Sequence, residues 1–103
     1  RRLEEEQKRR DVRARNVELD SILIELQSLY RDVLAAQMGA ETGRINVEED
    51  ERITTLAAEG DAIATLRRID VLRQARERLT TTMAPALIIE AAFIGLSNPW
   101  ITD

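Results

Sequence analysis

The sequence predicts an all-α fold: a small helical bundle of about four helices, with a long first helix and an apolar last helix. First, residues 1–38 contain neither Gly nor Pro and are rich in Arg, Glu and Gln, which are good helix formers. Second, apolar residues recur at spacings of three and four, which places them on one face of a helix. Third, no segment alternates with period two, so no sheet is expected.

The composition is that of one folded domain. The chain has 103 residues, of which 44% are hydrophobic and 33% are charged. This length allows one domain with a modest core, and the apolar content is too high for a disordered chain. A domain of this size stays marginally stable unless its packing is good or partners contribute.

The first predicted helix covers residues 1–38, and Gly39 fits a left-handed position just after its end. Its first dozen residues carry no apolar stripe. We therefore expect residues 1–18 to project, residues 19–98 to form the helical domain, and residues 99–103 to form a tail. The candidate core positions of this helix are Leu19, Ile22, Leu26, Leu29 and Val33.

A short second helix is expected next. Asn46 and Glu49 have the spacing of a capping box, and the acidic residues 48–51 suit the positive end of a helix dipole. Gly60 is expected to end this helix, and Asp61 is expected to cap the following one. The inward positions of the second helix are Ile53, Leu56 and Ala57.

The third predicted helix covers residues 62–79. The threonines at positions 80–82 are weak helix formers, so they are expected to end this helix before the next one begins. Most of its arginines fall on the face opposite the apolar stripe. That stripe consists of Ile63, Leu66, Ile69, Leu72 and Leu79, and Leu66 and Ile69 join the candidate core.

The fourth predicted helix, residues 85–96, starts with Pro85, which suits a first helical turn. Apolar residues cover nearly every face, and Glu90 is its one charged residue. A helix of this kind is expected to be enclosed, either by its own domain or by another subunit. Trp100 either packs back onto the domain or anchors a partner. The candidate subunit interface consists of Leu87, Ile88, Ala91, Phe93, Ile94 and Trp100.

The residue types exclude several kinds of chemistry. The chain has no Cys and no His, which removes thiol nucleophiles, structural zinc sites and His-based acid–base catalysis. Residues 48–51 lack the alternating ligands of a calcium loop, so they are interpreted as helix-start charges. Residues 39–44 contain Gly but lack the Lys-Ser/Thr ending of a phosphate loop. We predict no catalytic, cofactor-binding or metal-binding residue, and no ATP hydrolysis by this fragment.

The charge is unevenly distributed. The net charge is −4, while residues 1–15 hold seven basic and four acidic groups, or +3, which leaves −7 for the rest. An acidic body argues against a main nucleic-acid surface. The longest apolar stretch, residues 84–96, is too short to span a bilayer. With no Cys, a reducing cytoplasm fits. The chain starts at Arg1 without Met, as an excised fragment would.

Several segments, in this order, resemble the C-terminal domain of bacterial DNA polymerase III clamp-loader subunits. They are residues 3–10, residues 29–34 with Leu29-Tyr30-Arg31-Asp32, residues 45–46, the Arg-rich third helix, and residues 84–91. The lead-in Glu-Glu-Gln-Lys-Arg-Arg is most similar to the delta-prime subunit of actinobacteria. Related domains often have Asn where this chain has Ala84, so the helix cap is expected from Thr82.

The resemblance implies a role in replication. Clamp loaders have five subunits, whose C-terminal helical domains form a collar that holds ATPase modules, and those modules load the sliding clamp onto primed DNA. The implied partners are the gamma/tau and delta subunits, with DNA contacted only indirectly and with no membrane or small-molecule partner. The parent would belong to the DNA polymerase III holoenzyme, a DNA-directed DNA polymerase.

Three alternatives stay open. One is the equivalent domain of gamma/tau, which an intact Walker motif upstream would favour. Another is a free-standing helical scaffold or coiled-coil adaptor, self-associating through the apolar stripe of the first helix. A nucleic-acid-binding module ranks last, because acidic residues are interleaved with Lys8, Arg9 and Arg10.

Overall fold

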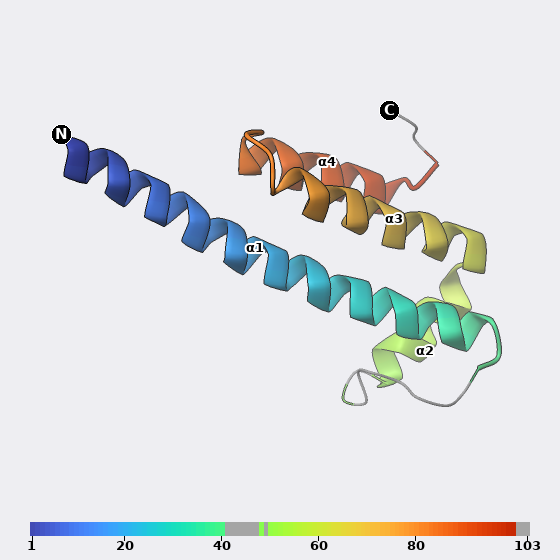
Figure 1. Cartoon of the computed structure of the whole chain (residues 1–103). Helices are drawn as coiled ribbons and strands as arrows, with labels where there is room; N and C mark the ends of the chain where they lie inside the picture. Colours follow the sequence, from blue (N-terminus) through green and yellow to red (C-terminus); the bar gives the residue numbers. More distant parts are fainter. Residues whose placement is uncertain (41–47, 49, 101–103) are drawn as a thin grey trace.

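In the computed structural model, which describes residues 1–40, 48 and 50–100, those residues form four helices and no strand (Figure 1). The helices are α1 (Arg2–Gln37), α2 (Asp50–Glu59), α3 (Ala62–Arg78) and α4 (Pro85–Ser97). The predicted all-α bundle with a long first helix is confirmed for this part of the chain. The first, third and fourth helices end within one residue of their expected bounds. The expected capping box of Asn46 and Glu49 lies outside the described residues.

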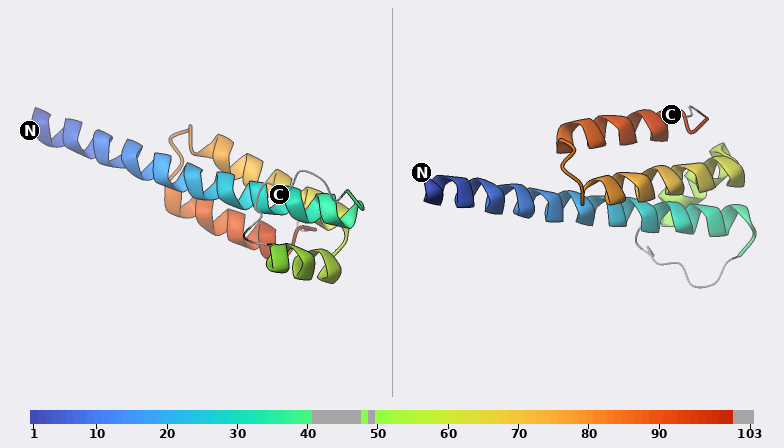
Figure 2. Two further views of the ribbon diagram at one scale, coloured as in Figure 1. Left: turned by 90° about the horizontal axis from the view of Figure 1, so that it is seen from below. Right: turned by 45° about the horizontal axis from the view of Figure 1, so that its top comes forward.

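The four helices are arranged around the α1–α3 pair. α3 packs along α1, α2 packs on α1, and α4 runs antiparallel to α3 (Figures 1 and 2). The main apolar cluster therefore lies where α1, α3 and α4 meet. Its buried members are Leu23, Leu72, Ala75, Leu79, Ile88 and Ala92, with Leu19, Leu26, Tyr30, Val71 and Leu96 packed at its edge.

The first turns of α1 project beyond the bundle, as both figures show. Every residue from 1 to 15 is exposed except the half-buried Glu6. Near the point where α1 meets α3, Asn16 Nδ2 donates a hydrogen bond to the carbonyl of Leu79 at 3.3 Å. The projection explains a radius of gyration of 16.3 Å, compared with about 13 Å for a compact domain of this length.

The C-terminal end of α1 is a Schellman motif. Gly39 has a φ of +78°, as expected for a left-handed residue after the helix. The Ala40 amide donates to Ala35 O at 2.8 Å, and the Gly39 amide donates to Ala36 O at 3.2 Å. These two bonds satisfy carbonyls that the last helical turn leaves without intrahelical partners.

Polar side chains join the ends of α1, α2 and α3. Asp61 caps α3 as predicted, because its Oδ1 accepts a 2.8 Å hydrogen bond from the Ala64 amide. The buried Thr65 hydroxyl donates to Gln37 Oε1 at 2.7 Å, and Gln37 Nε2 donates to Ala57 O at 3.4 Å. The C-terminal end of α1 is thereby tied to both following helices.

The connection between α3 and α4 is the break that the threonines predict. The hydroxyls of Thr80 and Thr81 donate back to Glu77 O and Arg78 O, so they occupy carbonyls at the end of α3. The expected cap from Thr82 is wrong, since α4 begins after Ala84 with no side-chain cap. Pro85 has no amide hydrogen, which leaves one fewer donor to satisfy there.

Most of the predicted core positions are inside the bundle. Of the nine predicted core positions, Val33 on α1 and Ile53 on α2 are fully buried, and five others are half-buried. Those five are Leu19, Leu26, Leu29, Leu56 and Ile69.

Two predicted core positions, Ile22 and Leu66, are wrong, because both side chains are more than half exposed. On α1 the face toward α3 is centred on Leu23, which adjoins the expected stripe, and on the buried Gln27, which does not belong to it. On α3 the buried residues Ala64, Thr65, Leu72, Ala75 and Leu79 define the inner face, and Ile63 of the expected stripe is exposed with Leu66.

Candidate interaction surface on the last helix

α4 is not enclosed by the rest of the described chain. Of the six predicted interface residues, Ile88 is 1% exposed and belongs to the core, so its assignment to an interface is corrected. Leu87, Phe93 and Ile94 are 58%, 61% and 56% exposed. Ala91 and Trp100 are exposed as well. These five residues are available to a partner, and their contact with one stays a prediction.

The exposed apolar residues lie on two sides of α4. At about 100° per residue, Leu87 and Ile94 fall within about 20° of each other, whereas Phe93 lies about 120° from Leu87. The exposed Glu90 falls between the two sides. α4 therefore presents two separate apolar surfaces: the Leu87 side, with Ala91 and Ile94, and the Phe93 side.

On the Leu87 side, a groove of about 420 Å³ runs between α3 and α4. The small residues Ala75, Ala92 and Gly95 line this groove. They allow α3 and α4 to approach each other closely. A Cβ built on Gly95 would lie 2.8 Å from Val71 Cγ1, so only glycine fits without movement. The Arg68 Nε–H also donates to Leu96 O at 3.0 Å, which joins the two helices at the end of α4.

Arg67 and Pro99 line the groove, and Trp100 is next to both of them. Asn98 Oδ1 accepts a 3.2 Å hydrogen bond from the Trp100 amide, which turns the chain back after Pro99. The Arg67 guanidinium lies over the indole ring, 4.4 Å from its centroid. The indole is nevertheless 53% exposed. Trp100 thus packs back onto the domain and still offers surface to a partner.

Salt bridges fix the polar sides of α3. Arg76 reaches α1, where its Nε–H donates to Asp20 Oδ1 at 2.8 Å and its Nη1–H donates to Gln27 Oε1 at 3.0 Å. The hydrogen bond to Asp20 raises the pKa of Arg76 above its ordinary value. On the outer side, hydrogen bonding and charge attraction from Asp70, with a contribution from Glu77, raise the pKa of Arg73. Both shifts stabilise the charged form of the guanidinium.

α1 has its own exposed apolar residues, which are scattered. Val17, Ile22 and Ile24 are all exposed. A coiled-coil adaptor would need an exposed apolar stripe on α1 for self-association. Most of that stripe packs within this domain instead, since Leu19 and Leu26 pack against the main apolar cluster and Val33 is buried.

Among residues 1–40, 48 and 50–100, no group of three Asp or Glu side chains is placed to hold a metal ion. Asp50 and Glu51 lie in the first turn of α2, as expected for helix-start charges. Over the same residues, no helix combines the length and apolarity needed to cross a membrane.

Sequence reasoning missed the groove and the Arg67–Trp100 stack. The two residues of the stack are far apart in the chain, and no local pattern pairs them. A glycine within an otherwise apolar helix was the available signal, because such a residue often marks a close approach of two helices. Comparison with known proteins gives no match to a family model, to a curated protein or to a solved structure.

Proposed function

We propose that this chain is a non-catalytic oligomerisation domain, and specifically the collar domain of a DNA polymerase III clamp-loader subunit of the delta-prime type. The observation that carries the proposal is the pair of exposed apolar surfaces on α4, the Leu87 side and the Phe93 side. A subunit in a closed ring contacts two neighbours through two different surfaces, and α4 offers two. The segment-by-segment resemblance described above supplies the particular assembly.

The energetics favour burial of these surfaces in an assembly. Leu87, Phe93 and Ile94 together leave three large side chains more than half exposed on a helix of 13 residues. Fully burying such a side chain contributes about 1.5–3 kcal/mol. Permanent subunit interfaces are the more apolar class of interface, and they resemble a domain core cut in two.

The projecting start of α1 suits a connection to a further module. Its exposed residues carry the basic excess of the chain, and a continuous helix transmits orientation better than a flexible linker. In the proposed assembly this segment leads toward the ATPase-like region, which would hold the nucleotide chemistry.

The proposal is tested by co-purification. The chain is mixed with the C-terminal domains of the gamma/tau and delta subunits from the same genome, and complexes are sized by light scattering after gel filtration. We expect a stable complex at moderate salt. Leu87→Arg and Phe93→Arg should each remove contact with one neighbour, whereas Ile24→Arg, an exposed apolar position on α1, should have no effect.

Absence of any complex with either subunit would count against the clamp-loader assignment. The upstream reading frame separates the two subunit types. A degenerate phosphate loop favours delta-prime, and an intact Walker motif favours gamma/tau.

A further inference from the structure

The groove between α3 and α4 has two unlike walls. The α4 wall is formed by Ala91, Ala92, Ile94 and Gly95 and carries no charge. The exposed Leu87 lies beyond this lining, on the same side of α4 as Ile94. The α3 wall carries Arg67, Asp70, Gln74 and Arg78, with Ala75 and Val71 toward the floor. The two helices run side by side (Figures 1 and 2). On α3 the lining runs from Arg67 to Arg78, a length of about 17 Å at about 1.5 Å per residue.

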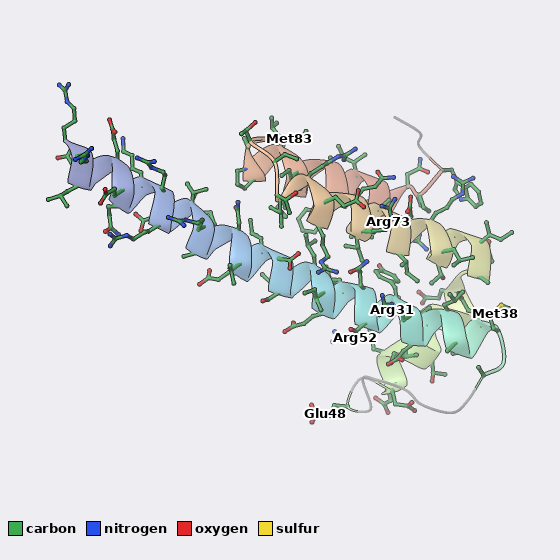
Figure 3. All side chains as sticks on the ribbon, viewed as in Figure 1. Arg31, Met38, Glu48, Arg52, Arg73 and Met83 are labelled. Atoms are coloured by element: carbon green, nitrogen blue, oxygen red, sulfur yellow. The ribbon has the colours of Figure 1, made fainter. Side chains whose placement is uncertain are left out.

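The α3 wall is positive because its one acidic residue is already compensated. Asp70 Oδ1 accepts from Arg73 Nε at 2.8 Å, and Asp70 Oδ2 accepts from Gln74 Nε2 at 3.0 Å. Figure 3 labels Arg73 part-way along α3. With Asp70 paired, the charge presented next to Trp100 is that of Arg67.

Arg67 is held in place before any partner arrives. Its guanidinium lies 4.4 Å from the Trp100 ring centroid, and Trp100 is itself positioned by the turn at Asn98. A guanidinium stacked on a ring keeps its N–H donors directed outward in its own plane, where they can pair with a carboxylate. Pre-positioning of this kind lowers the entropy cost of binding.

The shape of the α4 wall suits a helix. Leu87, Ala91 and Ile94 follow the spacing i, i+4, i+7, which forms a stripe along one face of a helix. The small Ala91 sits between two large side chains, so a partner side chain can enter at its level. A third helix laid on α3 and α4 would meet this stripe along its length.

We propose that this groove binds an amphipathic α-helix of a partner chain, with its apolar stripe against Leu87, Ala91 and Ile94 and an acidic residue paired with Arg67. This inference rests on the proposed function in one respect only, which is that the domain binds another protein chain. It adds the chemistry of that partner: a helix of about 14 residues with acidic residues beside an apolar i, i+4, i+7 stripe.

The experiment is a selection from a displayed library of helical peptides without Trp, with the whole chain as bait. We expect enrichment of sequences that place Glu or Asp beside the apolar stripe. Trp100 is the single tryptophan of the chain, so its fluorescence should change as a selected peptide saturates the groove. That change gives the affinity in the same measurement.

Variants locate the binding site. Ala91→Arg fills the groove and Arg67→Glu reverses its charge, and each should weaken a selected peptide about tenfold or more. Arg67→Lys should retain most of the preference for acidic peptides. Phe93→Arg on the other side of α4 and Arg2→Glu on the projecting part of α1 are matched controls and should leave binding unchanged. Leu87→Arg replaces Ala91→Arg if the latter lowers helix content by circular dichroism.

Three results would overturn the inference: no selected binder, binders without acidic residues, or binders insensitive to both groove variants. Sedimentation of the chain alone adds a fourth, because a dimer lost on Ala91→Arg would make a second copy the occupant. The two proposals fail separately. A clamp-loader complex that tolerates Ala91→Arg and Arg67→Glu removes the groove inference alone, whereas acidic binders without any clamp-loader complex remove the proposed function alone.

Discussion

Two glycines occupy positions where a larger residue would be strained or would clash. One is at the end of α1, and the other is where α3 and α4 pack closely. Gly39 adopts a left-handed conformation with open space where a Cβ would lie, whereas Gly95 has an ordinary helical backbone and no room for a Cβ. The first glycine is required by backbone conformation and the second by a neighbouring side chain. The two cases are separable by mutation.

Gly95→Ala should lower the free energy of unfolding by about 1–3 kcal/mol, because the added methyl overlaps the β-branched Val71. The measurement is urea denaturation followed by circular dichroism. In a Val71→Ala background the same substitution should cost much less, since the overlapping methyl groups are gone. An equal cost in both backgrounds would show that the close contact with Val71 is not the cause.

Gly39→Ala should lower the free energy of unfolding by about 1 kcal/mol, because an L-residue is strained at a φ of +78°. Thermal denaturation measures the loss. Gly60→Ala is the matched control. Its φ is outside the left-handed range and a Cβ there would meet ordinary contacts of 3.6 Å or more. We expect a change within about 0.5 kcal/mol for the control.

At the scale of the element, α4 combines a core face with exposed faces although nearly all its residues are apolar. The division follows position on the helix rather than residue type, since Ile88 is buried and Ile94 is exposed. The sequence shows that the helix is apolar all round, and it does not show which residues α3 and α1 cover.

Ile88→Asp should unfold the domain, because an unpaired carboxylate in the core costs several kcal/mol. Ile94→Asp should leave the domain folded and reduce partner binding. Circular dichroism and gel filtration with the proposed partners distinguish the two effects. Unfolding by Ile94→Asp would place that residue in the core instead.

The α1–α3 contact depends on Arg76 as well as on apolar packing. Because the pKa of Arg76 is raised, its charged form is stabilised in the folded state. The contribution is complete below the ordinary arginine pKa and is lost only as the pH rises through the still higher folded value. Arg76→Met should therefore lower the urea midpoint equally at pH 6 and pH 9. A strong difference between those two pH values would contradict this assignment.

Considered as a whole, the described chain is a helical bundle from which the N-terminal part of α1 projects. The first turns of α1 project beyond the rest of the described chain and are exposed, and isolated helical segments of this length are marginal in water. The free energy of local unfolding should therefore increase along α1, from a low value in the projecting part to a high value within the bundle.

Amide hydrogen exchange should show this gradient. Amides of residues 5–14 should exchange within about a factor of 100 of an unstructured chain, whereas amides near Leu23 and Val33, which are buried, should approach global protection. Uniform protection along α1 in the isolated chain would mean that another copy covers the projecting part.

Local sequence patterns were enough to predict the number and approximate bounds of the helices, the left-handed end of α1 at Gly39, the Asp61 cap and the threonine break. These features depend on residues close together in the chain: missing Gly and Pro, cap residues and apolar periodicity. Helix packing placed Leu23 and Gln27 rather than Ile22 on the face of α1 toward α3. It also placed Leu66 outside and Thr65 inside, and it made Ile88 part of the core. It also formed the groove beside Arg67 and Trp100. Those outcomes depend on how each helix is rotated about its axis when it packs, and a rotation of one residue position exchanges buried and exposed side chains without changing the periodic pattern.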